Sequence, residues 1–238
     1  MNHPVRLLFP VLCAALAAAC ATVPEKPVPP PAPDAAALTI VAEIALQRGD
    51  CRTAAETYAR AAQLASAPVA QRASEVGLAC EELSAAWTSA QRWRELAPRS
   101  REAQAMYATV ALKLYRIADA RAAVKAFLSA PPPPPRARGS GGHAGHGSGA
   151  KPIDTGDSAL ADLATLLLEE CDPPEVFAAL HGVIDTADAS PARLMLLGEL
   201  ALEAYDAQAA EGYALRAVAA RPGDPRANHL LARAYVVL

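Results

Sequence analysis

Few residues in this 238-residue chain have side chains suited to catalysis or metal binding. His143 and His146 form a His-x-x-His pair in a glycine-rich stretch, but a metal site needs three or four ligands held in a fixed geometry. Two Gly-x-Gly pairs, at 139–141 and 145–147, neither follow a predicted strand nor open a predicted helix. The chain has no Gly-x-Ser-x-Gly, His-Glu-x-x-His or P-loop motif. We therefore expect no catalytic residue, no metal and no cofactor, and a protein that is not an enzyme.

Cysteine is the other reactive residue type, and Cys51, Cys80 and Cys171 lie in the body of the chain. In the repeat pattern described below, Cys51 opens the second helix of one repeat and Cys80 ends the first helix of the next. Both would then lie on one edge of the array and could pair. Adjacent helices lie about 10 Å apart, which is long for a disulfide. Free, half-buried thiols are therefore the expected state.

Cys20 directly follows a predicted targeting segment. Arg6 precedes an apolar run from Leu7 to Ala19, which is too short to span a membrane and ends in small residues, as a signal peptide does. Small residues directly before Cys20 resemble a bacterial lipobox, and an ordinary cleaved signal is the alternative. The resemblance implies a signal peptide at 1–19 and a palmitate-carrying Cys20. Ala21, where an inner-membrane protein would carry Asp, indicates a lipid anchor in the outer membrane that faces the periplasm.

Composition separates the remaining segments. Residues 20–36 are rich in proline and form a predicted tether. A proline run followed by Gly, Ser and His predicts a disordered, dispensable insert at 131–156. The rest is alanine-rich with only 5% aromatic residues, which favours helix over an all-β fold. A net charge of −3 gives no basic footprint for nucleic acid.

Small residues recur beyond the tether. Ala54, Ala86, Ala120, Ala179 and Ala210 are separated by steps of 32, 34, 59 and 31 residues, and the long step equals one repeat plus the insert. This spacing resembles the tetratricopeptide repeat (TPR) of about 34 residues, in which two helices form each unit. The fold class that the resemblance implies is all-α: a right-handed TPR helix-turn-helix solenoid over 37–238, with about 5.5 repeats and a disordered Pro/Gly-rich insertion.

Two details of the repeat pattern are specific enough to test. A weaker fourth copy is expected to contain Leu166, Leu167, Ala179 and Val183. In the fifth copy, Ala210 is expected to face Gly198, where the two helices approach closely. The last repeat stops after one helix at Leu238, and an apolar edge there would need a partner or a further segment to cover it.

In the TPR motif, the first helix of each repeat lines a concave groove that binds partners. The positions that point into it here are Thr39, Glu43, Gln47, Gln71, Glu75, Ala105, Thr109, Lys113, Met195, Glu199 and Glu203. The expected groove is mildly acidic with apolar patches; solvated helix faces are the alternative. It lacks the Lys/Asn clamp with which chaperone-binding members hold a C-terminal carboxylate.

The opening repeats resemble one group of proteobacterial TPR lipoproteins. The similar stretches are 41–50, 70–73, 85–87 and Trp93 with Ala97-Pro98. The best-known type in that group is an outer-membrane adaptor that binds a periplasmic C-terminal processing protease and delivers cell-wall hydrolases to it. The resemblance therefore implies a lipid-anchored scaffold that binds periplasmic proteins. An envelope-assembly factor, as a pilotin or an outer-membrane assembly subunit, is the alternative.

Overall fold

The computed structural model describes residues 34–131 and 156–238. The predicted signal peptide, Cys20, His143, His146 and nearly all of the predicted tether and insert lie outside these residues. The described residues form eleven helices and no strand: α2 (Ala35–Gln47), α3 (Cys51–Leu64), α4 (Ala67–Ala79), α5 (Leu83–Leu96), α6 (Arg101–Lys113), α7 (Ile117–Ser129), α8 (Gly156–Glu170), α9 (Pro173–Ile184), α10 (Pro191–Glu203), α11 (Ala207–Ala220) and α12 (Pro225–Val237).

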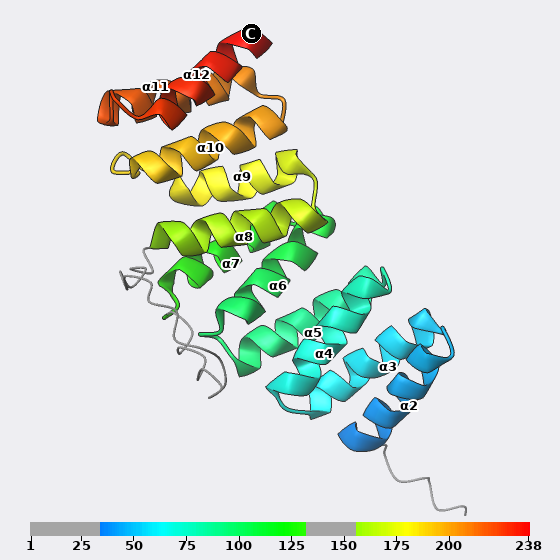
Figure 1. The fold of residues 1–238 in the computed structure, drawn as a ribbon. Helices are drawn as coiled ribbons and strands as arrows, with labels where there is room; N and C mark the ends of the chain where they lie inside the picture. The colour runs from blue at the N-terminus through cyan, green and yellow to red at the C-terminus, as the bar shows by residue number, and fades with distance from the viewer. Residues whose placement is uncertain (1–33, 132–155) are drawn as a thin grey trace, which may run out of the picture. The chain divides into compact units, whose positions relative to one another are not determined.

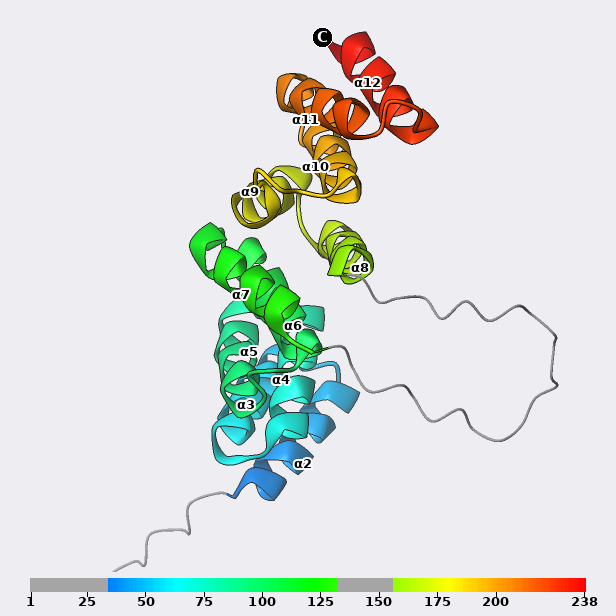
Figure 2. The ribbon, with the colours of Figure 1, turned by 90° about the vertical axis from the view of Figure 1, so that its left-hand side faces the viewer.

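The helices follow one another as pairs in chain order (Figure 1). Helices α2, α4, α6, α8 and α10 are the first, or A, helices, and α3, α5, α7, α9 and α11 are the second, or B, helices. Each B helix also packs on the next A helix, as α3 does on α4 and α11 does on α12. Figure 2 places α7 and α9 on one side and α6 and α8 on the other. Five pairs and one further helix confirm the predicted all-α TPR-type solenoid.

Capping residues fix where most helices begin. The carboxylates of Asp34, Asp50, Asp206 and Asp224 and the hydroxyls of Ser100 and Ser190 accept hydrogen bonds from backbone N–H groups in the first turn of their helices. Each cap satisfies a donor that the helix leaves unpaired. Proline stands in the first turn of α4, α9, α10 and α12, where its missing N–H costs nothing.

Four of the five turns within pairs share one geometry. The second linking residue has a positive φ, at Gly49 (75°), Glu81 (58°), Tyr115 (56°) and Tyr205 (61°). The next residue donates its N–H to a carbonyl five residues earlier, as Asp50 does to Ala45 at 2.9 Å. This is the Schellman termination, which satisfies the last carbonyls of the A helix. The turn fixes how each B helix folds back on its A helix.

The fourth pair departs from this turn. Only Cys171 and Asp172 link α8 to α9, whereas three residues link every other pair. Of the residues expected in this copy, Leu167 and Ala179 are buried, but Leu166 is 41% exposed. The expected register is wrong by three residues, because the buried equivalents of Leu197, Ala210 and Ala214 are Leu163, Val176 and Leu180. The structure aligns Asp157 with Pro191, 34 residues later. Val176 likewise aligns with Ala210, 34 residues later, so both helices are shifted together. Ala179, the residue expected at this position, is buried as well, and residues three apart share one face of a helix, so the two registers look alike in the sequence.

The close approach within a pair is also shifted by one helical turn. A Cβ on Gly77 of α4 would lie 2.7 Å from the backbone nitrogen of Ala86 in α5. The equivalent residue in α10 is Ala201, and it is Ala201 that clusters with Ala210. The expectation that Ala210 faces Gly198 is therefore wrong. The nearest atoms to a Cβ on Gly198 belong to Leu230 of α12. The missing side chain at Gly198 therefore leaves room for Leu230 of the next repeat.

Cys51 and Cys80 form a disulfide, with their Cα atoms 5.3 Å apart. The expectation of free thiols is wrong for this pair. The distance of about 10 Å applies to helix axes, whereas these cysteines stand at helix ends. Cys51 is the first residue of α3, and Cys80 follows the last residue of α4, so the antiparallel helices bring them together. Cys171 is a free thiol.

The buried core runs along the array. The largest cluster extends from Ala86 to Ala227, and a second joins α2 through α6. All belong to one unit, Asp34–Leu238. In the parts of the chain that the structure describes, every helix is too short or too polar to cross a membrane.

Candidate functional site

The predicted groove residues all lie on A helices. Four of them, Gln71, Glu75, Ala105 and Thr109, line one groove of about 630 Å³, and Lys113 lines a neighbouring pocket. Met195 and Glu199 line a pocket between α10 and α12, and Glu203 lines the next one along. Thr39, Glu43 and Gln47 lie along α2, away from these four pockets. The structure therefore brings together the residues from α4 and α6 and leaves the other members separate.

The main groove lies between α4, α6 and α8. Its base and walls are apolar, with Trp93 from α5 and Phe127 from α7 as the largest side chains. Thr109 adds little polarity, because it is 2% exposed and its hydroxyl donates to the carbonyl of Ala105 at 3.1 Å. Arg101 stands at one end of the groove, where its guanidinium lies 5.5 Å from the Phe127 ring centroid and donates to the carbonyl of Ala130. A groove of this size suits bulky apolar side chains.

Helix α8 forms the wall that the sequence pattern missed. It buries Leu160, Leu163 and Leu167 on one face. A stripe at four-residue spacing, Asp162, Leu166 and Glu170, remains exposed and lines the groove. Residues at i, i+4 and i+8 share one face of a helix, so these three side chains present one edge to a ligand.

A polar contact fixes the start of α8. Asp157 accepts hydrogen bonds from Arg193 at 2.7 Å and from the hydroxyl of Ser190 at 2.8 Å. Burial opposes the charge of Asp157, but these two donors outweigh it and hold the pKa of the carboxyl below its ordinary value. The contact ties α8 to α10 across the fourth repeat.

A second pocket of about 450 Å³ continues from the groove at the turn edge, because both are lined by Leu78 and Glu170. Three more carboxylates line it: Glu81, Asp172 and Glu175. Lys113 is its one basic residue and lies 3.3 Å from Glu170. The two pockets together give a continuous groove, apolar at one end and acidic at the other, which we call the α4–α8 groove.

Elsewhere on the A helices, arginines pair with two of the three predicted acidic residues, Glu43 and Glu199. Glu43 pairs with Arg72 at 3.4 Å and accepts a hydrogen bond from Tyr58, and this hydrogen bond is the main reason that the pKa of Glu43 falls below its ordinary value. Glu199 pairs with Arg233. By contrast, among the described residues Glu75, Glu102 and Asp162 make no ion pair. Negative charge is therefore concentrated at the α4–α8 groove.

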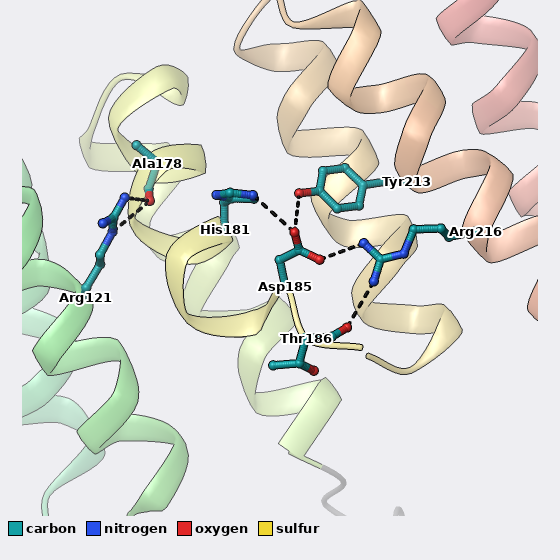
Figure 3. A network of polar contacts seen from close by, with 7 residues as sticks. All are labelled: Arg121, Ala178, His181, Asp185, Thr186, Tyr213 and Arg216. Carbon is teal, nitrogen blue, oxygen red and sulfur yellow. Dashed lines mark hydrogen bonds and ion pairs between the residues drawn. The ribbon is translucent and has the colours of Figure 1, made fainter. Parts of the chain in front are cut away.

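A polar network on the B helices holds α9 in place between α7 and α11 (Figure 3). Asp185 accepts hydrogen bonds from Arg216 at 2.7 Å and from Tyr213 at 3.1 Å. On the other side, Arg121 of α7 donates to the carbonyl of Ala178 at 2.9 Å. Burial and the nearby Asp185 raise the pKa of Tyr213 to about 12, so its hydroxyl stays a donor at neutral pH. The network compensates for the sparse contact between α8 and α9.

Residues that could do covalent or metal chemistry are not assembled in the described residues. No group of three or more His, Cys, Asp or Glu side chains there is placed to hold a metal ion. Burial raises the pKa of the Cys171 thiol to about 11, and a thiol in that state is a poor nucleophile.

The sequence pattern missed Asp162, Leu166 and Glu170 as groove residues, because the fourth repeat was read three residues out of register. One signal could have corrected it: Pro173 and Pro174 follow Asp172, and proline is typical of the first turn of a helix. Trp93 and Phe127 belong to the buried core and line the groove as well.

Comparison with known proteins adds little to this description. No protein-family model and no characterised protein matches the chain. Among solved structures, the chain is similar to a tetratricopeptide repeat protein from Parabacteroides merdae ATCC 43184, with 14% identity over 93% of this chain and 90% of that one and a TM-score of 0.34. Similarity that low carries no functional argument, and the repeat assignment depends on the helix pairing and turns described above.

Proposed function

We propose that this chain is a lipid-anchored scaffold on the periplasmic side of the outer membrane, and that it binds protein partners through the A helices. The α4–α8 groove is the observation that carries the proposal. It is open, lined by bulky apolar side chains and rimmed by carboxylates, of which Glu170 alone makes an ion pair among the described residues. Soluble proteins expose contiguous apolar surface mainly where they bind something.

The disulfide supports the location. Structural disulfides persist in oxidising compartments such as the periplasm and are rare in the cytosol. Cys51–Cys80 joins two consecutive helices at a turn edge, so it would stabilise the first two repeats after export. The lipid anchor is supported by the apolar run and the small residues before Cys20.

The candidate partners follow from the resemblance of the opening repeats to protease adaptors. They are a periplasmic C-terminal processing protease and the cell-wall hydrolases that such an adaptor delivers. In this proposal the chain supplies binding surface and proximity, and the chemistry belongs to the partners. Bringing two proteins to one scaffold raises their effective concentration without any new contact between them.

The test is affinity capture from detergent-solubilised envelope with the full-length chain as bait, read by mass spectrometry against an unrelated lipoprotein bait. We expect a processing protease together with cell-wall hydrolases. Capture of a secretin or of the β-barrel assembly machinery would support the envelope-assembly alternative instead. A protein list no different from that of the control bait would contradict the scaffold proposal.

A further inference from the structure

We infer that the α4–α8 groove binds a partner segment that carries a bulky apolar side chain beside one or more Lys or Arg residues. This inference rests on the proposed function and names the chemistry of its ligand. It concerns a short peptide segment of another protein, and the apolar and acidic ends of the groove each select one part of that segment.

The apolar end selects the anchor. Leu166 of α8 and Met106 of α6 face the same space, and Trp93 and Phe127 close its base. Leu166 is 41% exposed although it lies beside this apolar lining, so an incoming side chain would cover it. Burial of an aromatic or large aliphatic anchor in such a pocket is the usual source of most binding energy at an interface.

Charge selects what flanks the anchor. Seven carboxylates line the α4–α8 groove: Glu75, Glu81, Glu102, Asp162, Glu170, Asp172 and Glu175. Two basic residues lie among them, and both are engaged: Lys113 with Glu170, and Arg101 with the Ala130 carbonyl and the Phe127 ring. A basic partner is therefore attracted and an acidic one repelled, which sets specificity and association rate.

One buried oxygen agrees with a basic ligand. Oε2 of Glu175, in the acidic end of the groove, is buried and has no hydrogen-bond donor among the described residues. A buried acceptor without a donor is costly. A guanidinium or ammonium group entering from the groove would supply the donor.

The test uses a random dodecapeptide display library as the probe, selected on the full-length chain. We expect enriched peptides to share an aromatic or large aliphatic residue within a few positions of Lys or Arg. Two variants then report on the apolar anchor site and on the negative charge beside it, and both change residues of the same stripe on α8. Leu166→Glu should weaken binding of the enriched peptides at least about 10-fold, because it places a charge against the anchor. Asp162→Lys should weaken binding by a similar factor, and more strongly at low salt.

Each variant has a matched control. Leu215→Glu changes a leucine of α11 that is 46% exposed, and Glu169→Lys reverses an exposed charge on α8 outside the groove. Both should bind the peptides within about twofold of the parent. Equal melting of all four variants and the parent would show that the losses come from the site and not from unfolding.

Three outcomes would overturn the inference: no enrichment, enriched peptides without basic residues, or enriched peptides that bind Leu166→Glu and Asp162→Lys as well as the parent. If envelope capture by the full-length chain succeeds while one of these is found, the scaffold proposal stands and only the groove chemistry is wrong. If capture also fails, the scaffold proposal fails with it.

Discussion

Two helical glycines, Gly77 and Gly212, differ in the space around them. Gly77 of α4 lies against the backbone of α5, so that a Cβ there would be 2.7 Å from the nitrogen and 2.8 Å from the Cα of Ala86. Gly212 of α11 is also helical, but nothing lies within 4 Å of its Cβ position. Helix propensity favours alanine at both sites, and packing permits it at only one.

Gly77→Ala should therefore destabilise the chain, by about 1–2 kcal/mol, because the overpacking cost exceeds the gain in helix propensity. Gly212→Ala should stabilise it by about 0.5–1 kcal/mol, the helical difference between glycine and alanine. Thermal melting of the two variants beside the parent measures both. A stabilised Gly77→Ala would mean that α4 and α5 are not in the close contact described.

Asp185 is the residue that should make stability depend on pH. The hydrogen bond from Arg216 is the main cause that holds the pKa of Asp185 below its ordinary value, and the one from Tyr213 adds to it, while burial opposes them. A carboxyl with a depressed pKa stabilises the fold above its unfolded pKa of about 3.9. That contribution is lost as the pH falls through the folded pKa.

Asp185→Asn should lower stability by about 0.5–1 kcal/mol at pH 7 and pH 5, the range for a solvent-accessible pair, and by less at pH 3. Melting at the three pH values measures this. Asp188→Asn removes an exposed carboxylate of the same loop and should change little at any of them. A deficit for Asp185→Asn that is as large at pH 3 as at pH 7 would show that the network does not depend on the charge.

At the scale of elements, the shared turn between paired helices requires one residue with a positive φ. Gly49 adopts the positive φ without cost, whereas Tyr205 adopts it with a side chain that is 91% exposed. The left-handed conformation costs an ordinary residue about 1–2 kcal/mol. Because the Tyr205 side chain packs against little, the cost of its backbone conformation should decide how a substitution there changes the free energy of unfolding.

Tyr205→Gly should accordingly stabilise the chain by about 0.5–1 kcal/mol, after the extra backbone entropy of glycine is subtracted. Gly49→Ala should destabilise it by about 1 kcal/mol, since no atom lies within 4 Å of the Cβ position and only the backbone is strained. Chemical denaturation of both variants tests the pair. A destabilised Tyr205→Gly together with a stabilised Gly49→Ala would contradict the shared turn geometry.

The regular elements could be predicted from the sequence because each repeats one spacing. Ala54, Ala86, Ala120 and Ala210 are all fully buried, as the period required. The fourth repeat could not be placed, because it follows an insert whose length the repeat spacing does not fix and because Val176 and Ala179 are both buried. An error of three residues moved Asp162, Leu166 and Glu170 out of the predicted groove. Residues three apart share one face of a helix, so periodicity alone does not distinguish two registers that differ by three residues.

At the scale of the whole molecule, the proposed function combines a membrane anchor at one end with a binding groove in the body. The anchor prediction concerns Cys20, which follows Ala18-Ala19 at the end of the apolar run. One acyl chain gives only marginal membrane binding, so the several chains typical of bacterial lipoproteins would be needed for a permanent tether.

Cys20→Ser should leave an unprocessed precursor that does not incorporate labelled palmitate. Cys13→Ser is the matched control, since that cysteine lies within the apolar run, and it should be processed and labelled like the parent. Labelling that persists in Cys20→Ser and disappears in Cys13→Ser would show that Cys13, and not Cys20, carries the lipid.

The central claim is that the α4–α8 groove is where partners bind, and site-specific photocrosslinking in intact cells tests it most directly. The photoreactive residue p-benzoylphenylalanine is placed at position 166 in one full-length variant and at position 215 in another, both exposed leucine sites. A groove that binds partners should give a discrete crosslinked protein from position 166 that is reduced by adding Asp162→Lys, and none from position 215. Equal crosslinking from both positions, or none from position 166 while capture from envelope succeeds, would contradict it.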